Sequence, residues 1–327
     1  MTKDQWLSVR KQIPDGAREP WTVMLWVADL LLLAVAWNLW LADSTALQLL
    51  GLALAGLATV QLYLIMHEAT HGAASANRRL NDFIGHCDGW LIALPFLVRR
   101  RFHMAHHTWT AHPVNDPENR GMIERFSVMT KKQERTLEFV WKHWIPMIAA
   151  NHFLLNWRAP FIARAKGDSS PRILKEIRFA RLYLAGYLAA AVLAWSLGHL
   201  LDLVLFYGIT WVFLFFMVEL LNLPHHAEAP LLPRDADRLQ FWEQDVVSHD
   251  CKDLPLWSRY VILNFNLHIV HHAFPSVPWY RLAQVQKLLS EHEVGHAPSQ
   301  THEWAFAVKN RRRPLLQLMG HFFDQRG

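Results

Sequence analysis

Residues 46–71 read ALQLLGLALAGLATVQLYLIMHEATH, an apolar run that ends in a pair of histidines. The 21 residues from 46 to 66 contain no Asp, Glu, Lys or Arg. As a helix they would extend about 31 Å, which matches a bilayer core. His67 and His71 follow directly and are four residues apart, so a helix places both imidazoles on one face. The stretch therefore predicts a membrane-spanning helix that delivers two ligating side chains at its end.

Two further histidine clusters share the pattern His-x-x-His-His, at residues 103–107 and 268–272. With 20 histidines in 327 residues, two copies of this pattern are not expected by chance. Imidazole is a ligand for Zn, Cu, Fe and Ni, and eight imidazoles exceed what one ion can hold. The sequence therefore predicts a site for two metal ions. The clustered histidines are His67, His71, His103, His106, His107, His268, His271 and His272.

The distribution of cations predicts four membrane spans. Hydrophobic residues make up 52% of the chain, and no Lys or Arg occurs between Arg18 and Arg78 or between Arg181 and Arg234. Each gap holds two apolar runs separated by a short break, which is typical of a transmembrane hairpin. The expected spans are residues 21–42, 46–66, 180–200 and 203–223.

Orientation follows from the positive-inside rule. The first 18 residues, the segment between the two gaps and the last third of the chain are basic, whereas both hairpin turns lack Lys and Arg. Both termini and every histidine cluster are therefore expected on the cytoplasmic side, in a bacterial inner membrane. The predicted fold is a single all-α integral membrane domain over residues 1–327. Its four transmembrane helices carry a cytoplasmic helical cap, residues 67–179 and 224–327, which holds the two-metal histidine site.

Two shorter apolar segments are too interrupted to be spans. Residues 83–98 number about 16, include Pro95, and are interpreted as one interfacial or re-entrant helix. Residues 137–163 are aromatic and apolar but contain Lys142, Pro146 and Arg158. They are interpreted as an amphipathic helix on the membrane surface.

The chemistry of the site has three readings. Histidines at span ends beside an apolar interior favour a redox-active metal, and iron is the natural candidate for oxidising C–H bonds with O2. His67-Glu68-Ala-Thr-His71 is also His-Glu-x-x-His, the signature in which two histidines bind zinc and the glutamate activates water. A membrane zinc metalloprotease is therefore one alternative, although it leaves both His-x-x-His-His clusters unexplained. A non-catalytic metal-binding or transport protein is another, but it would place ionisable groups within the membrane.

The three clusters, in this order and with two transmembrane hairpins, resemble the membrane fatty acid desaturase superfamily, which includes hydroxylases and carotenoid oxygenases. The resemblance extends over roughly residues 67–282. It implies a non-haem site for two Fe ions, with the clustered histidines as ligands. Some members add Asn-x-x-x-His, which Asn222 and His226 match; His226 would then be a ninth ligand and Asn222 would act through a water. The neighbouring His225 is an alternative to His226.

The resemblance also implies a reaction. Two ferrous ions, O2 and two external electrons would remove hydrogen from a fatty acyl chain or a free fatty acid, with desaturation as the first choice. Oxidative decarboxylation to a terminal alkene and hydroxylation of a lipid or carotenoid share the first step. These outcomes differ in how the substrate is placed, so cluster spacing does not separate them.

Partners follow from what the sequence contains. It has no His-Pro-Gly-Gly of a fused cytochrome b5 and no flavin or nicotinamide fingerprint, so an external electron donor is expected, such as ferredoxin with its reductase. The sequence pI is 9.3 and the net charge is +5, but no nucleic-acid recognition motif is present. Membrane lipid and an acidic redox protein explain the basic charge better. The two cysteines, Cys87 and Cys251, do not suggest a disulfide framework.

Overall fold

The computed structural model describes residues 1–14, 16–251, 258–291 and 303–315. These residues form α-helices and one short three-ten helix, without a β-strand. The parts of the expected cap at residues 252–257, 292–302 and 316–327 lie outside the described residues. The elements are α1 Lys3–Gln12, α2 Trp21–Trp40, α3 Thr45–Thr70, α4 Arg78–Leu91, α5 Phe96–Trp109, α6 Pro117–Ser127, α7 Lys131–Lys142, α8 Met147–Ala165, α9 Pro171–Ser196, α10 Leu200–His226, η1 Phe241–Val246, α11 Ser258–Val261, α12 His268–Ala273, α13 Trp279–Glu291 and α14 Glu303–Asn310.

Four helices, α2, α3, α9 and α10, are long and apolar enough to cross a membrane. The prediction of an all-helical chain with four candidate spans is therefore confirmed. However, the ends of these helices differ from the ends of the apolar runs in the sequence. α3 continues to Thr70, so His67 lies in its last turn, and α9 begins at Pro171 rather than near residue 180. The side chain of Ser170 caps the N-terminal end of α9. α9 stops at Ser196, short of residue 200, because Gly198 adopts a left-handed conformation with φ of 80°.

The chain divides into two compact units, and each is described by itself. The first comprises residues 1–17, 102–147 and 218–327, and the second comprises residues 18–101 and 148–217. The boundaries fall within the long helices α5 and α10, as well as at residues 17 and 147.

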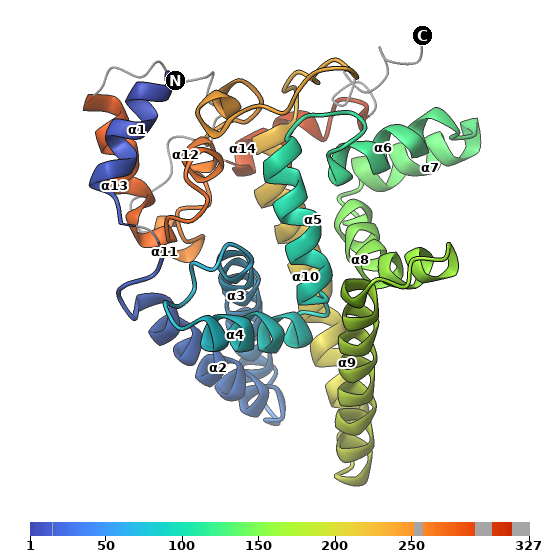
Figure 1. Cartoon of the computed structure of the whole chain (residues 1–327). Helices are drawn as coiled ribbons and strands as arrows, with labels where there is room; N and C mark the ends of the chain where they lie inside the picture. Colours follow the sequence, from blue (N-terminus) through green and yellow to red (C-terminus); the bar gives the residue numbers. More distant parts are fainter. Residues whose placement is uncertain (15, 252–257, 292–302, 316–327) are drawn as a thin grey trace. The chain divides into compact units, whose positions relative to one another are not determined.

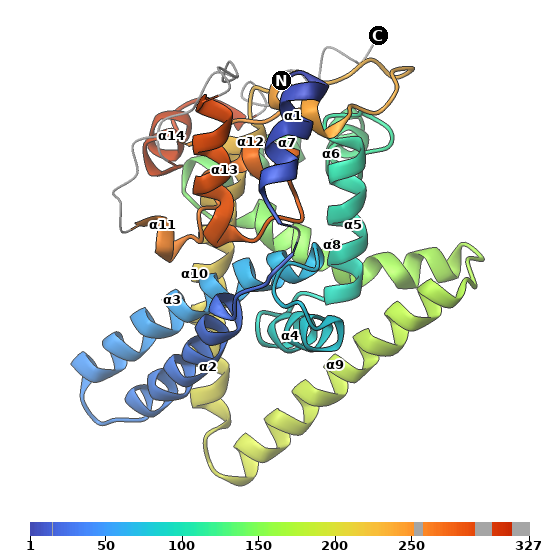
Figure 2. The ribbon, with the colours of Figure 1, turned by 60° about the vertical axis from the view of Figure 1, so that its left-hand side comes forward.

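The second unit is built on close helix packing. α2 lies along α3, and α4 packs against α3 (Figures 1 and 2). A Cβ added at Gly51 of α3 would come within 2.7 Å of the carbonyl oxygen of Ala36 on α2, so this glycine allows the two helices to approach closely. The indole of Trp26 on α2 donates to the buried carboxylate of Asp88 on α4 at 2.7 Å. A polar contact thus fixes α4 beside the first candidate span.

Two helices replace each of the single helices expected at residues 83–98 and 137–163. α4 ends at Leu91 and α5 begins at Phe96, because Ala93 takes a positive φ of 58° just before Pro95. α7 and α8 are separated in the same way, with Trp144 at a φ of 59° ahead of Pro146. The expectation of continuous helices was wrong because apolar content does not reveal these turns.

We expect Gly89→Ala to destabilise the second unit. A Cβ at Gly89 would lie 2.6 Å from the carbonyl oxygen of Leu94, a backbone atom held in the turn after α4. Overpacking of this kind costs about 1–3 kcal/mol. The measurement is the free energy of unfolding in detergent. The matched control is Gly121→Ala on α6, where nothing lies within 4 Å of the new Cβ; it should be neutral or stabilising, and equal losses in both variants would contradict the packing argument.

The first unit has a core that holds the third histidine cluster. α1 packs against α13, and the indole of Trp6 donates to the carbonyl oxygen of Ala273 at 2.8 Å (Figure 1). This hydrogen bond connects α1 to the short helix α12, which carries residues 268–272. The buried apolar side chains of this core are Val9, Ile13, Val270, Ala273, Phe274, Val277, Leu282, Val285 and Leu289.

Candidate metal centre

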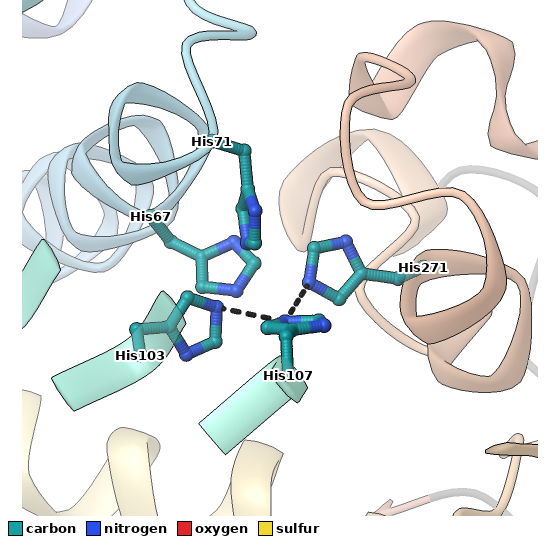
Figure 3. A group of neighbouring side chains, drawn as sticks. All are labelled: His67, His71, His103, His107 and His271. Carbon is teal, nitrogen blue, oxygen red and sulfur yellow. Dashed lines mark hydrogen bonds between the residues drawn. The ribbon is translucent and has the colours of Figure 1, made fainter. Parts of the chain in front are cut away.

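The first unit brings three imidazoles together from α5 and α12. His103 and His107 lie one turn apart on α5, and their Nε2 atoms are 3.1 Å apart. The Nε2 atom of His271 on α12 lies 3.1 Å from that of His107 (Figure 3). The ligand nitrogens of these three residues, here called the first triad, all lie within 4.8 Å of one another. The i, i+4 spacing on α5 thus has the consequence expected from the sequence.

A second triad consists of His106, His226 and His272, whose ligand nitrogens also lie within 4.8 Å of one another. His268 joins it, because its Nε2 lies 3.0 Å from that of His226 and 3.1 Å from that of His272. The second cluster therefore divides between the two triads: His103 and His107 serve one, and His106 serves the other. Seven histidines of the first unit form two adjacent groups of nitrogen donors.

His67 and His71 belong to the second unit and are described on their own. His67 is buried in the last turn of α3, and His71 is the residue that caps this helix. Their ring centroids are 5.2 Å apart (Figure 3). The helix therefore delivers both imidazoles at its end, with the pairing that the spacing predicts.

Two buried partners fix which nitrogen of a ring carries the proton. Nδ1 of His106 lies 3.0 Å from Oδ2 of Asp116, and Nδ1 of His272 lies 2.8 Å from Oε1 of Gln244. A carboxylate or amide oxygen only accepts hydrogen bonds, so each Nδ1 is the donor and each Nε2 keeps a lone pair. Such partners orient metal-binding imidazoles. Both Nε2 atoms thus face the second triad as acceptors.

Burial keeps the imidazoles of His268 and His271 neutral. It lowers the pKa of His271 to about 3, with a further contribution from nearby His106 and His225. It also lowers the pKa of His268 well below its usual value. Burial raises the pKa of Asp116, an effect that the adjacent His106 opposes. Because a metal binds the unprotonated nitrogen, imidazoles that are neutral at pH 7 are ready to act as ligands.

His225 and His226 differ in placement. His226 belongs to the second triad, whereas Nδ1 of His225 donates to the carbonyl oxygen of His249 at 2.8 Å and its ring stacks on that of His268. Nδ2 of Asn222 donates to the carbonyl oxygen of Val218, one turn earlier on α10, at 2.8 Å. The structure therefore groups His226 with the other donors and places His225 against the polypeptide behind them.

Gln244 was not predicted from the sequence. It lies on η1, in a polar segment without periodic apolar residues, and its neighbours carry no ligand pattern. Only the hydrogen bonds of the folded protein show that this glutamine is a partner of a histidine. Asp116 follows the second cluster in the sequence; its carboxylate contacts His106 and also caps the N-terminal end of α6.

We expect Asp116→Asn to weaken metal binding by about 10–100-fold, the range typical of residues that orient a ligand. The amide no longer guarantees an acceptor at Nδ1 of His106. Isothermal titration of the metal-free protein with Co²⁺ measures the change. Asp202→Asn is the matched control, because Asp202 forms an exposed pair with His199 at 3.1 Å. If the two variants bind Co²⁺ equally well, Asp116 has no role in orienting His106.

Comparison with known proteins identifies the family. Residues 43–304 match the family model described as "Fatty acid desaturase". The chain belongs to the fatty acid desaturase family. This membership confirms the resemblance inferred from the three histidine clusters, and it agrees with a helical membrane protein.

Individual relatives of this desaturase-family chain are distant. It is 27% identical over 233 residues to an omega-3 fatty acid desaturase, chloroplastic, of Ricinus communis, an alignment that covers 68% of this chain and 49% of the relative. It is 24% identical to an sn-1 oleoyl-lipid 12-desaturase of Arthrospira platensis, with 69% of this chain and 64% of the relative covered. It is 26% identical to a temperature-sensitive sn-2 acyl-lipid omega-3 desaturase (ferredoxin), chloroplastic, of Arabidopsis thaliana, with 68% and 52% covered. The chain thus spans about half to two thirds of the length of these relatives.

Proposed function

We propose that this protein is an O2-dependent membrane oxidoreductase that introduces a double bond into a fatty acyl chain or free fatty acid at a site for two iron ions. The observation that carries the proposal is the pair of histidine triads in a chain of the fatty acid desaturase family. Relatives named as omega-3 and Delta(12) fatty acid desaturases support the substrate class.

The donors fit iron. Each triad offers neutral nitrogen ligands, which suit Fe, and two triads correspond to two ions. The Nε2 atoms of His272 and His268 lie 3.1 Å apart, with the lone pair of His272 directed at its neighbour. A cation bound between such rings would be coordinated by their Nε2 lone pairs. When bound, the irons would supply the activation of O2 that oxidation of an unactivated C–H bond requires.

The proposed ligands are the histidines that the family resemblance implies: His67, His71, His103, His106, His107, His226, His268, His271 and His272. In the proposal Asn222 acts through a water. In this proposal the four spans form two transmembrane hairpins, and residues 67–179 and 224–327 form a cytoplasmic cap in one domain. The position of the cations supports this orientation, because the short turns after α2 and after α9 contain no Lys or Arg, whereas the segment between the two pairs of spans is basic.

The overall reaction balances without a further oxidant. Two hydrogen atoms leave adjacent CH2 groups, and two external electrons with two protons complete the reduction of O2 to two molecules of water. The protein's own groups bind and orient: the neutral imidazoles add no charge to the site, and Asp116 and Gln244 keep Nε2 of their histidines available. An external one-electron donor is required, and the name of the Arabidopsis relative includes ferredoxin.

The test is product formation by the purified full chain in lipid vesicles. With O2, ferredoxin, its reductase and a nicotinamide reductant, we expect a fatty acyl product two mass units lighter, together with consumption of O2. Omission of the reductant or of O2 should abolish it. A product heavier by one oxygen would show hydroxylation, and a terminal alkene with CO2 would show decarboxylation; either would overturn desaturation while retaining the metal centre. Peptide cleavage without O2 would overturn the proposed class.

Glu68 distinguishes the oxidase from a zinc protease. If Glu68 is not the base that activates water, Glu68→Gln should retain activity within about 10-fold, well short of the 100-fold to 10,000-fold that a general base contributes. Turnover of the acyl substrate and metal content are measured together. Complete inactivation with the metal retained would revive the reading of residues 67–71 as a protease motif.

A further inference from the structure

The segment of residues 244–250 touches every histidine-bearing element of the first unit. The carbonyl oxygen of His249 accepts a hydrogen bond from Nδ1 of His225, at 2.8 Å. Oδ1 of Asp250 accepts the backbone N–H of Ile269, at the start of α12, at 2.7 Å. The segment therefore links the end of α10 to the first turn of α12 through hydrogen bonds.

Gln244 extends these contacts to α5. Its side-chain Nε2 donates to the carbonyl oxygen of His107 at 2.7 Å, and its Oε1 lies 2.8 Å from Nδ1 of His272. The hydroxyl of Thr110 lies 3.0 Å from the same Oε1. Gln244 is 1% exposed, so water does not compete for these bonds. One buried amide thus links two histidine clusters that are more than 160 residues apart in sequence.

The hydrogen bond to the carbonyl oxygen of His107 determines the orientation of the Gln244 side-chain amide. A backbone carbonyl accepts but cannot donate, so the NH2 group must face His107 and the oxygen must face His272. His272 must then carry its proton on Nδ1 and direct the lone pair of Nε2 into the second triad. A histidine in the opposite tautomer would present an N–H to the metal and could not bind it.

We propose that residues 244–250 orient the second triad. Gln244 is the positioning residue: it fixes the tautomer of His272 and the position of His272 relative to α5. This inference rests on the metal centre of the proposed function, but not on the reaction. Gln244 does not itself contact the donor nitrogens of the triad; it acts through His272 and the backbone of His107.

The test compares two replacements of Gln244 in the full chain. Gln244→Met preserves volume but removes both the acceptor for His272 and the donor to His107. Gln244→Glu restores the acceptor. With Co²⁺ as the probe, the wild type should bind two ions. Gln244→Met should bind one of them about 10–100-fold more weakly and leave the other within about threefold, and Gln244→Glu should recover most of the loss.

Several outcomes would overturn the assignment. One is wild-type affinity of Gln244→Met for both ions, and another is impairment of Gln244→Glu equal to that of Gln244→Met. Equal weakening of both ions, with a lower unfolding temperature of the metal-free protein, would show a general structural role. Gln12→Met, an exposed residue of α1, is the control for the substitution. Because the readout is Co²⁺ binding, failure of the desaturation assay would leave this result intact.

A separate hollow lies between the end of α8 and one face of α9, with a volume of about 530 Å³. Three guanidinium groups, Arg164, Arg178 and Arg181, share it with the apolar side chains of Leu174, Leu182 and Ala185, among others. None of the described residues that line it is a carboxylate. Among the described residues Arg178 and Arg181 have no hydrogen-bond or ion-pair partner, and Arg164 donates to the hydroxyl of Ser169.

The order of these residues along α9 matches a membrane boundary. Arg181 is the last charged residue of the helix, and the apolar remainder of the candidate span follows it. The hollow therefore offers uncompensated positive charge beside apolar side chains. A molecule with a phosphate headgroup and an acyl chain has the complementary distribution. We infer that this hollow binds an anionic phospholipid.

Thermal unfolding of the full chain in detergent tests this inference. Added phosphatidylglycerol should raise the unfolding midpoint by about 2–4 °C, whereas phosphatidylcholine with the same chains should not. The variant with Arg178→Gln and Arg181→Gln should lose the shift, and Arg172→Gln, outside the hollow, should keep it. An equal shift with phosphatidylcholine, with inorganic phosphate alone, or in the double variant would overturn the assignment.

Discussion

His271→Ala is expected to abolish turnover while the chain stays folded. Nε2 of His271 lies 3.1 Å from that of His107, and burial lowers the pKa of His271 to about 3, so the ring is a neutral donor in the first triad. Since enzymes accelerate reactions at least a million-fold, loss of a ligand should reduce product formation by at least about 1,000-fold. Product yield and metal content are measured on the same preparation.

The control for this substitution is His143→Ala. His143 follows α7, is exposed, and its Nδ1 lies 2.8 Å from the carbonyl oxygen of Phe139. It should retain wild-type turnover and metal content. A His271→Ala protein that keeps both metals and its activity would contradict the ligand assignment, whereas one that fails to fold would be replaced by His271→Gln.

Arg311→Met is expected to cause the largest loss of stability. The Arg311 guanidinium is buried, donates to Glu219 at 2.9 Å and to the carbonyl oxygen of Trp141 at 3.0 Å, and lies over the Trp141 ring at 3.8 Å. Removing one member of a buried ion pair leaves the other charge without compensation, at a cost of about 3–5 kcal/mol. Unfolding in detergent, followed by tryptophan fluorescence, gives the free energy.

A second substitution separates charge from packing. Glu219→Leu combined with Arg311→Met removes both charges, so it should be more stable than Arg311→Met alone. Arg313→Gln is the surface control: Arg313 pairs with Glu228 at 2.7 Å, but both side chains are well exposed, and the cost should be below about 1 kcal/mol. Equal losses for Arg311→Met and Arg313→Gln would refute the view that burial makes the first pair important.

Much of the fold could be predicted because it is encoded in simple patterns. An apolar run of residues 46–66 predicts a span whatever its neighbours are, and α3 contains all of it. The spacing of His103 and His107 predicts two rings on one helical face, and their Nε2 atoms are 3.1 Å apart. These features depend on local geometry, which a sequence specifies directly.

Other features depend on contacts between distant residues. The turn at Ala93 and the early end of α9 arise from single backbone conformations that apolar content does not report. Gln244 gains its importance only because folding places it between His107 and His272. Likewise, His226 lies with the other nitrogen donors and His225 bonds the carbonyl oxygen of His249, a difference that two adjacent histidines in a sequence do not reveal.

Metal analysis of the anaerobically purified chain shows whether the three histidine clusters hold one pair of irons. We expect about two irons per chain in the wild type, and a marked loss of iron both in His71→Ala, at the end of α3, and in His107→Ala, on α5. A single zinc per chain, or a His71→Ala protein that retains both irons with an unchanged X-ray absorption spectrum, would contradict it.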